Sequence, residues 1–195
     1  MIGQLRKLSL LCLYALPVWI ALRSAWLLLR RRNRFQPFRE VFLCLFVIFM
    51  AGILQMALDG KWAAPSEMLS AAATRLRTGE KIHLTLFQTI GPQLRALPRE
   101  SALTQLLGNT LLFVPWGFCL PLLWRSFRKP LLLVCAALFL TCFIEFTQLF
   151  IDRFFELDDI FLNTLGSLLG SGLWGLLHRI WPQSDRYLLA GVRNP

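Results

Sequence analysis

Long runs of apolar residues constrain this chain more than any other feature of its sequence. They cover about residues 8–29, 41–58, 103–124, 130–151 and 160–180. Each run is close to the ~20 residues that an α-helix needs to cross the hydrocarbon core of a bilayer. Hydrophobic residues make up 56% of the chain and the mean hydropathy is +0.55, which exceeds the apolar share of a soluble domain. The sequence therefore predicts an all-α integral membrane protein, a bundle of about five transmembrane helices.

The spacing of these runs divides the 195 residues into four segments. Residues 1–58 are predicted to hold two transmembrane helices joined by a basic loop. Residues 59–101 form the one long connection, predicted to be an external loop that carries a short helix. Residues 102–181 are predicted to form a three-helix core, and residues 182–195 a tail.

The basic residues gather in the connections between the runs. They form two groups, Arg30, Arg31, Arg32, Arg34 and Arg39 in the first, and Arg125, Arg128 and Lys129 in the second. Basic loops favour the cytoplasmic side, so the sequence predicts a multi-pass protein whose C-terminus is cytoplasmic and whose acidic turn, 152–159, lies outside. The net charge of +10 does not indicate a nucleic acid partner, because the basic residues are not interleaved with stacking aromatic residues.

The long connection contains a helix signal and an extended signal. The pattern predicts a short helix over 67–78 with Ser66 as its N-cap and Gly79 as its terminator. The apolar side of this helix is predicted to lie on the outer leaflet or on the bundle. Apolar and polar residues then alternate over 82–87, which predicts an extended segment packed on the outer mouth of the bundle.

Polar residues recur along the run 130–151 at the spacing of one helix face. They are separated by four, three and four positions, at Thr141, Glu145, Gln148 and Asp152. Residues at these separations share one side of a helix. A carboxylate that faces lipid is strongly disfavoured, so this side is expected to face the bundle interior or a wet cavity. Arg153 and Lys81 are candidate counter-charges for Glu145.

The neighbouring runs supply further polar groups. The side-chain amide of Asn109 suits a hydrogen bond to Glu145 or to Asn163. Asp158 and Asp159 open the last run, where an N-cap and a favourable interaction with the helix dipole explain one of the two acids.

The last run also contains small residues at a regular spacing. Gly166 and Gly170 form a GxxxG pattern. Small residues at this spacing allow two helices to approach closely within a membrane. We therefore expect these glycines to serve helix packing.

The polar residues together predict one cluster in the outer half of the last three helices. Its members are Asn109, Glu145, Gln148, Arg153, Asp158, Asp159 and Asn163. The cluster is either a ligand-binding pocket or a structural polar network. The sequence contains no H-E-x-x-H, G-x-S-x-G or P-loop motif, so no cofactor is expected. An oxygen-ligand site for Mg²⁺ or Ca²⁺ is an open alternative, with Glu145, Asp152, Glu156, Asp158 and Asp159 as its candidate ligands.

These residues resemble the signatures of the VanZ-like family of bacterial membrane proteins, over about residues 82–175. One signature, Asn followed by Leu-Phe, Pro and Gly, is present as Asn109, Leu112, Phe113, Pro115 and Gly117. A second signature is present as Glu145, Gln148, Phe150, Arg153, Asp158, Asp159, Asn163, Gly166 and Gly170. The chain departs from the family at Glu156, where Asp is common, and at 83–87, where His-Leu-Thr-Leu-Phe replaces Asn-Leu-x-Pro-Phe.

The resemblance implies a cell-envelope role in a bacterial cell membrane. The name-giving member of the family is associated with resistance to teicoplanin, a lipidated glycopeptide antibiotic. The partners that the resemblance implies are membrane lipid and a lipid-linked cell-wall precursor or a lipoglycopeptide.

Three functions fit these observations. In the first, the cluster forms an outward-facing polar pocket that binds the head of a lipidated or lipid-linked amphiphile. In the second, the chain is an intramembrane enzyme acting on a lipid-linked substrate, with Glu145 or Asp159 as general base. In the third, the chain is a structural membrane partner and the polar cluster only holds the helices together.

Overall fold

The computed structural model describes residues 17–25, 36–88, 91 and 99–185. Its elements are α2 (Pro37–Ala57), α3 (Pro65–Thr78), β1 (Ile82–His83), α5 (Arg99–Leu123), η1 (Arg125–Arg128), α6 (Pro130–Gln148), η2 (Leu149–Ile151), β2 (Phe155–Glu156) and α7 (Leu157–Ile180). Two of these, η1 and η2, are short 3-10 turns.

Four of the described helices are long and apolar enough to cross a membrane. They are Pro37–Ala57, Leu106–Leu123, Pro130–Ile151 and Leu157–Ile180. The predicted fold class, an all-α integral membrane protein, is thereby confirmed. The predicted first transmembrane helix, 8–29, lies mostly outside the described residues, although residues 17–25 are helical.

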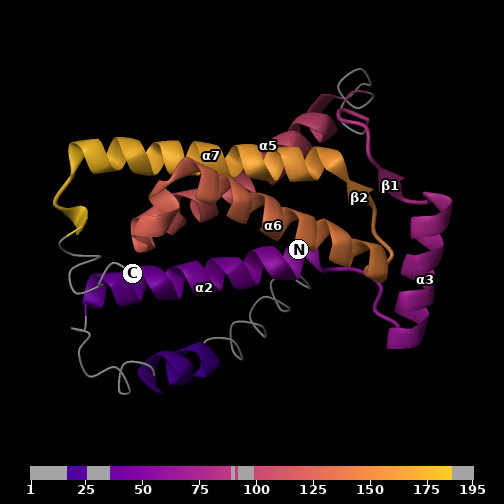
Figure 1. Cartoon of the computed structure of the whole chain (residues 1–195), viewed down its shortest axis with the longest axis horizontal. Helices are drawn as coiled ribbons and strands as arrows, with labels where there is room; N and C mark the ends of the chain where they lie inside the picture. Colours follow the sequence, from indigo (N-terminus) through magenta and orange to yellow (C-terminus); the bar gives the residue numbers. More distant parts are fainter. Residues whose placement is uncertain (1–16, 26–35, 89–90, 92–98, 186–195) are drawn as a thin grey trace.

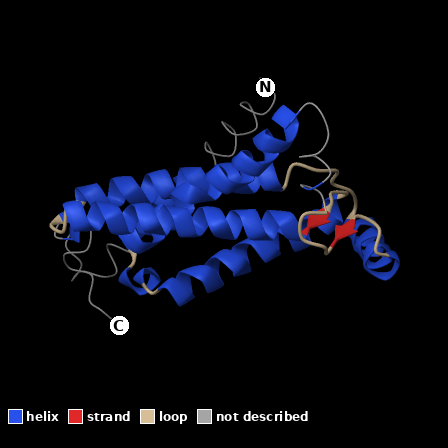
Figure 2. Cartoon of the chain, turned by 90° about the horizontal axis from the view of Figure 1, so that it is seen from above, coloured by secondary structure: helices blue, strands red, loops and turns tan. Residues whose placement is uncertain are grey.

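The long helices α2, α5, α6 and α7 run along the long axis of the molecule, and α3 lies across one end of them (Figure 1). The two-residue strands β1 and β2 pair in parallel at this same end (Figure 2). We call it the α3 end, and it comprises α3, β1, η2, β2 and the start of α7. The opposite end, at which α5 passes through η1 into α6 and α7 stops, is called the η1 end.

The closest helix contact joins α5 and α7 through glycine. A Cβ atom added to Gly166 would lie 2.0 Å from the carbonyl oxygen of Thr110, and one added to Gly117 would lie 1.9 Å from that of Ser167. Any side chain at these positions would push the two backbones apart. The predicted packing role of the GxxxG pattern is confirmed.

The remaining core is apolar and is shared by α2, α5 and α6. Trp116 and Leu120 of α5 pack against Leu133 and Ala137 of α6, and Ile53 of α2 joins a second cluster with two further buried residues, Phe113 and Ile144. Large apolar side chains also point outward along the bundle, as expected where lipid rather than water surrounds the helices.

Local sequence explains where the helices begin. Proline stands in the first turn of α2, α3 and α6, where its missing N–H costs no helical hydrogen bond. For α3 this corrects the predicted start: Ala64 is the N-cap, and Ser66 lies inside the helix. The predicted terminator is confirmed, since Gly79 adopts the left-handed conformation with φ of 72°.

The predicted extended segment over 82–87 is only partly right. Ile82 and His83 form β1, but the chain then enters a turn over 85–88. Phe87 has a φ of 64° within this turn. The ladder ends at His83, because β2, the partner of β1, is itself only two residues long.

Candidate functional site

The polar stripe of α6 faces the bundle interior, as its spacing predicts. Thr141, Glu145 and Gln148 are all buried, with Glu145 1% exposed. Asp152 leaves the stripe, because α6 ends at Gln148 and Asp152 itself has a φ of 65°. This left-handed residue turns its carboxylate away from the interior.

Asp152 instead accepts bonds from basic side chains of the long connection. Lys61 Nζ lies 2.9 Å from Oδ2 and Arg75 Nη2 lies 2.8 Å from Oδ1, and Lys81 Nζ also bonds Oδ1. The hydrogen bonds from Lys81 and Lys61 hold the pKa of Asp152 well below its usual range. These contacts fasten α3 and the start of β1 to the turn after α6.

Arg153 and Gln148 bind the end of α2. Arg153 Nη1 donates to the carbonyl oxygens of Met56 at 3.1 Å and Ala57 at 3.4 Å, and Gln148 Nε2 donates to that of Ala57 at 3.2 Å. The last carbonyls of a helix have no partner within the helix, and a cation there also complements the helix dipole.

Of the two predicted counter-charges of Glu145, Lys81 is wrong, because it bonds Asp152. Arg153 interacts with Glu145 through its charge, but it donates its hydrogen bonds to the α2 carbonyls. Glu145 Oε2 instead accepts the backbone N–H of Glu156 at 2.9 Å. Glu156 is the N-cap residue of α7 and makes no side-chain cap bond. The carboxylate of α6 thus meets the chain where α7 begins.

Asp158 and Asp159 occupy the first turn of α7 and bind outward in two directions. Asp158 is buried, and its Oδ1 accepts the backbone N–H of Phe87. Asp159 Oδ1 accepts a hydrogen bond from Asn109 Nδ2, which corrects the predicted partner of Asn109. The structure therefore links α5, the 85–88 turn and α7 through these two acids.

Asn163 lies one turn further along α7. It is buried, and its carbonyl oxygen accepts a hydrogen bond from Ser167 Oγ at 2.8 Å. The residue thus faces the helical interior, together with the close-packed glycines.

His83 is a polar residue at this end that the sequence did not single out. Its Nδ1 lies 3.7 Å from Glu156 Oε1, and its ring centroid lies 5.2 Å from that of Phe154. The contact follows from the pairing of His83 with Glu156 between β1 and β2. No spacing rule within the sequence relates two strands that lie so far apart.

The carboxylates at the α3 end bind different partners. Within the described parts of the chain, no group of three or more His, Cys, Asp or Glu side chains is arranged to hold a metal ion. Asp152 is bonded to basic side chains, whereas Asp158 accepts a backbone amide. The arrangement thus offers no geometric support for the Mg²⁺ or Ca²⁺ alternative.

An apolar groove runs beside this polar cluster, and the sequence gave no signal for it. Its volume is about 250 Å³. It is lined by Leu86, Leu138, Leu157, Ile160, Phe161, Thr164, Leu165 and Leu168. These residues come from the 85–88 turn, α6 and the first half of α7, so the groove begins at the α3 end and runs into the membrane-spanning part.

The long apolar helices, the glycine-packed interface and the inward polar side chains define a multi-pass helical membrane protein. Among known families, the VanZ/LLP1 family matches residues 42–178, and the chain belongs to this family. The match confirms the resemblance to the VanZ-like family and extends it into α2. No curated protein and no solved structure matches the chain.

Proposed function

We propose that this protein binds the hydrocarbon chain of a lipidated or lipid-linked amphiphile in the groove between α6 and α7, with the polar head at the α3 end. The supporting observation is the groove itself, about 250 Å³ in volume and apolar on every side except at Thr164. Its volume lies just below the ~300–1,000 Å³ of pockets that enclose a whole small molecule. That size suits a chain better than a bulky head group.

The position of the groove supports the same function. Leu138, Phe161 and Leu165 are partly exposed on the membrane-spanning surface, so a chain can enter from the surrounding lipid. From Leu157 to Leu168 the groove follows about 16 Å of α7. A chain of that length lies parallel to the lipid tails and keeps its apolar surface out of water.

The polar cluster stands where the head would lie. Leu86 is adjacent to Phe87, whose amide bonds Asp158, and Leu157 directly precedes this acid. Polar groups here, Asn109, Glu145, Gln148, Arg153, Asp158, Asp159 and Asn163, are those that the sequence proposes for ligand binding. Because the chain belongs to this family, we propose that the amphiphile is a lipid-linked cell-wall precursor or a lipoglycopeptide such as teicoplanin.

The contacts favour binding over catalysis. Glu145 is 1% exposed and its Oε2 is bonded to the Glu156 amide. A substrate would reach this carboxylate only after β2 moved away. A general base must lie within hydrogen-bond reach of the proton that it removes.

Filling the groove tests the proposal. We expect Thr164→Trp to abolish the crosslinks that a photoactivatable lipid with a diazirine in its acyl chain forms with the groove-lining residues of α7, and to reduce any teicoplanin resistance that the wild-type protein confers. Leu169→Trp is the matched control, because Leu169 is 51% exposed on the same helix and does not line the groove. Equal crosslinking of Thr164→Trp and wild type would refute chain binding in the groove.

A further inference from the structure

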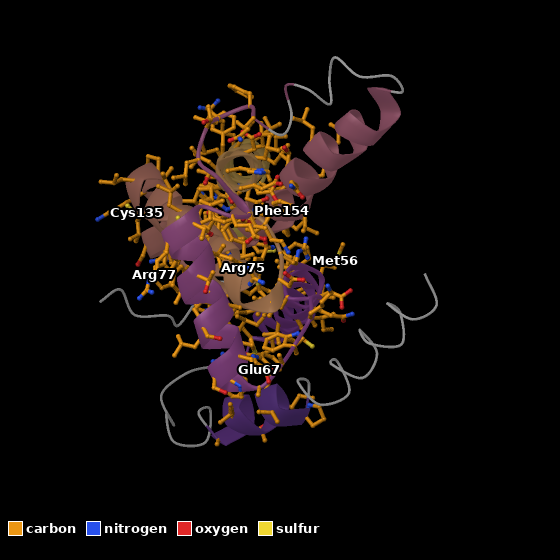
Figure 3. The ribbon with its side chains drawn as sticks, turned by 90° about the vertical axis from the view of Figure 1, so that its right-hand side faces the viewer. Met56, Glu67, Arg75, Arg77, Cys135 and Phe154 are labelled. Carbon is orange, nitrogen blue, oxygen red and sulfur yellow. The ribbon has the colours of Figure 1, made fainter. Side chains whose placement is uncertain are left out.

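Helix α3 is attached to the bundle along one side. Ala72 on this side is 1% exposed. Arg75 reaches past it to Asp152 and to the carbonyl oxygen of Leu149 in η2. Figure 3 looks onto the α3 end and shows Arg75 and Arg77 on opposite sides of the helix.

Exposed apolar residues flank Ala72 along the edge of this packed side. Leu69 is 64% exposed and Leu76 is 55% exposed. They are seven positions apart, which places them two turns apart on the same side. Trp62, just before the helix, is 63% exposed. In water these side chains would forgo about 25 cal/mol for each Å² of apolar surface that they could bury.

The depth of α3 is set by what it contacts. It packs on η2, and η2 ends the apolar span Pro130–Ile151. The axis of α3 also lies across the spanning helices rather than along them (Figure 1). The helix therefore lies at the level where the hydrocarbon core gives way to lipid head groups.

Further apolar side chains are exposed beside α3 at this end of the bundle. Met56 at the end of α2 is 61% exposed, and Phe154 before β2 is 48% exposed; both lie at the α3 end (Figure 3). Arg77 of α3 is exposed, so a cation also lies close to the apolar side chains. Apolar side chains next to basic ones are the pattern of helices that lie in a membrane interface.

We propose that α3 is an interfacial helix whose Leu69, Leu76 and neighbouring Trp62 insert into the lipid–water boundary at the α3 end of the bundle. The partner is the lipid surface of the membrane that the chain itself spans. Tryptophan favours this zone because its ring is amphipathic. This attachment holds the Lys61–Asp152 and Arg75–Asp152 contacts at a fixed depth, and it does not depend on what the groove binds.

Site-directed spin labelling tests the proposal. A full-length variant without its five native cysteines is labelled singly at Leu69→Cys or Leu76→Cys, and reconstituted in phospholipid nanodiscs. Ser70→Cys and Thr74→Cys are matched controls, because both residues are exposed polar positions of the same helix. All four side chains are exposed, so a label at any of these positions leaves the buried contact of Ala72 in place.

For each label, the measured quantity is the ratio of its collision rate with oxygen to its collision rate with a water-soluble nickel complex. We expect this ratio to be severalfold higher at positions 69 and 76 than at positions 70 and 74. Equal nickel access at all four positions would place α3 in water and overturn the proposal. Spin–spin broadening at positions 69 and 76 would show a second copy of the chain on this side, and would overturn it as well.

Discussion

The α5–α7 interface and the α3 end hold the same bundle together by different means. Between α5 and α7, glycines bring backbone against backbone, with Gly170 as close to Val114 as Gly166 is to Thr110. At the α3 end, polar side chains of one segment bind backbone groups of another. The difference follows from position: inside the membrane the helices have no free backbone groups, whereas their ends do.

The polar residues at the α3 end match the helix ends that they contact. Arg153 lies at the C-terminal end of α2, where a cation is favourable. Asp158 and Asp159 lie in the first turn of α7, where acidic side chains are favourable, and Glu145 accepts a backbone N–H at the same helix end. The cost of placing these groups near the hydrocarbon core is thereby offset by bonds to groups that would otherwise be unsatisfied.

The largest expected effect breaks the glycine interface. Gly166→Ala would place a Cβ 2.0 Å from the Thr110 carbonyl oxygen, and we expect it to lower the free energy of unfolding by about 3 kcal/mol or more through overpacking. Gly172→Ala is the control, since nothing lies within 4 Å of its added Cβ, and a gain of up to about 1 kcal/mol is expected from helix propensity. The free energies of unfolding of both variants are measured in mild detergent by titration with a denaturing detergent. Equal free energies would contradict the close contact between α5 and α7.

A smaller effect is expected from removing a helix-end contact. Arg153→Ala leaves the Met56 carbonyl without its side-chain donor and removes one of the two side-chain donors to the Ala57 carbonyl, and should cost about 2 kcal/mol. Arg77→Ala, which removes an arginine from the exposed side of α3, should leave the thermal midpoint unchanged. If Arg153→Ala kept full stability but lost amphiphile binding, Arg153 would act on the ligand and the structural account of this residue would fail.

The smallest expected effect is a change in pH dependence. The pKa of Asp152 is lowered by its bonds to Lys81 and Lys61, so its stabilising contribution is complete above the unfolded pKa of about 4 and declines as the pH falls below that value. Wild-type protein should therefore lose thermal stability as the pH falls below about 4. Asp152→Asn should show a shallower loss over the same range.

The control for this pH series is Glu67→Gln, which removes an exposed carboxylate of α3 without touching the Asp152 contacts. Its pH profile should follow that of the wild type. A profile of Asp152→Asn as steep as the wild-type one would show that these ion pairs do not stabilise the α3 end.

Much of the fold was predictable because apolar length determines it. The predicted spans 41–58, 130–151 and 160–180 differ from α2, α6 with η2, and α7 by only a few residues at either end. The start of α3 was missed because Pro65 at the first turn outweighs Ser66 as a start signal. The inward side of α6 was predicted correctly for Glu145 and Gln148, since a helix carries its periodicity without reference to its neighbours.

The contacts of the site were not predictable in the same way. Periodicity placed Asp152 with Glu145, but the helix ends at Gln148 and the left-handed turn reverses its direction. Asn109 was expected to bond Glu145 or Asn163 and bonds Asp159. The groove was not predicted from the sequence, because its walls come from three separate segments of the chain.

By itself, the sequence determined that this chain spans a membrane, which side of α6 faces inward, and which family the chain resembles. Hydropathy and helical period decide those properties, and both act over a few turns of one helix. The tertiary structure alone decided which groups pair. Arg153 and Met56 are separated by 97 positions, and Lys61 and Asp152 by 91. A local pattern cannot specify such a pairing, because it depends on where each helix ends and which free backbone groups come to lie beside it.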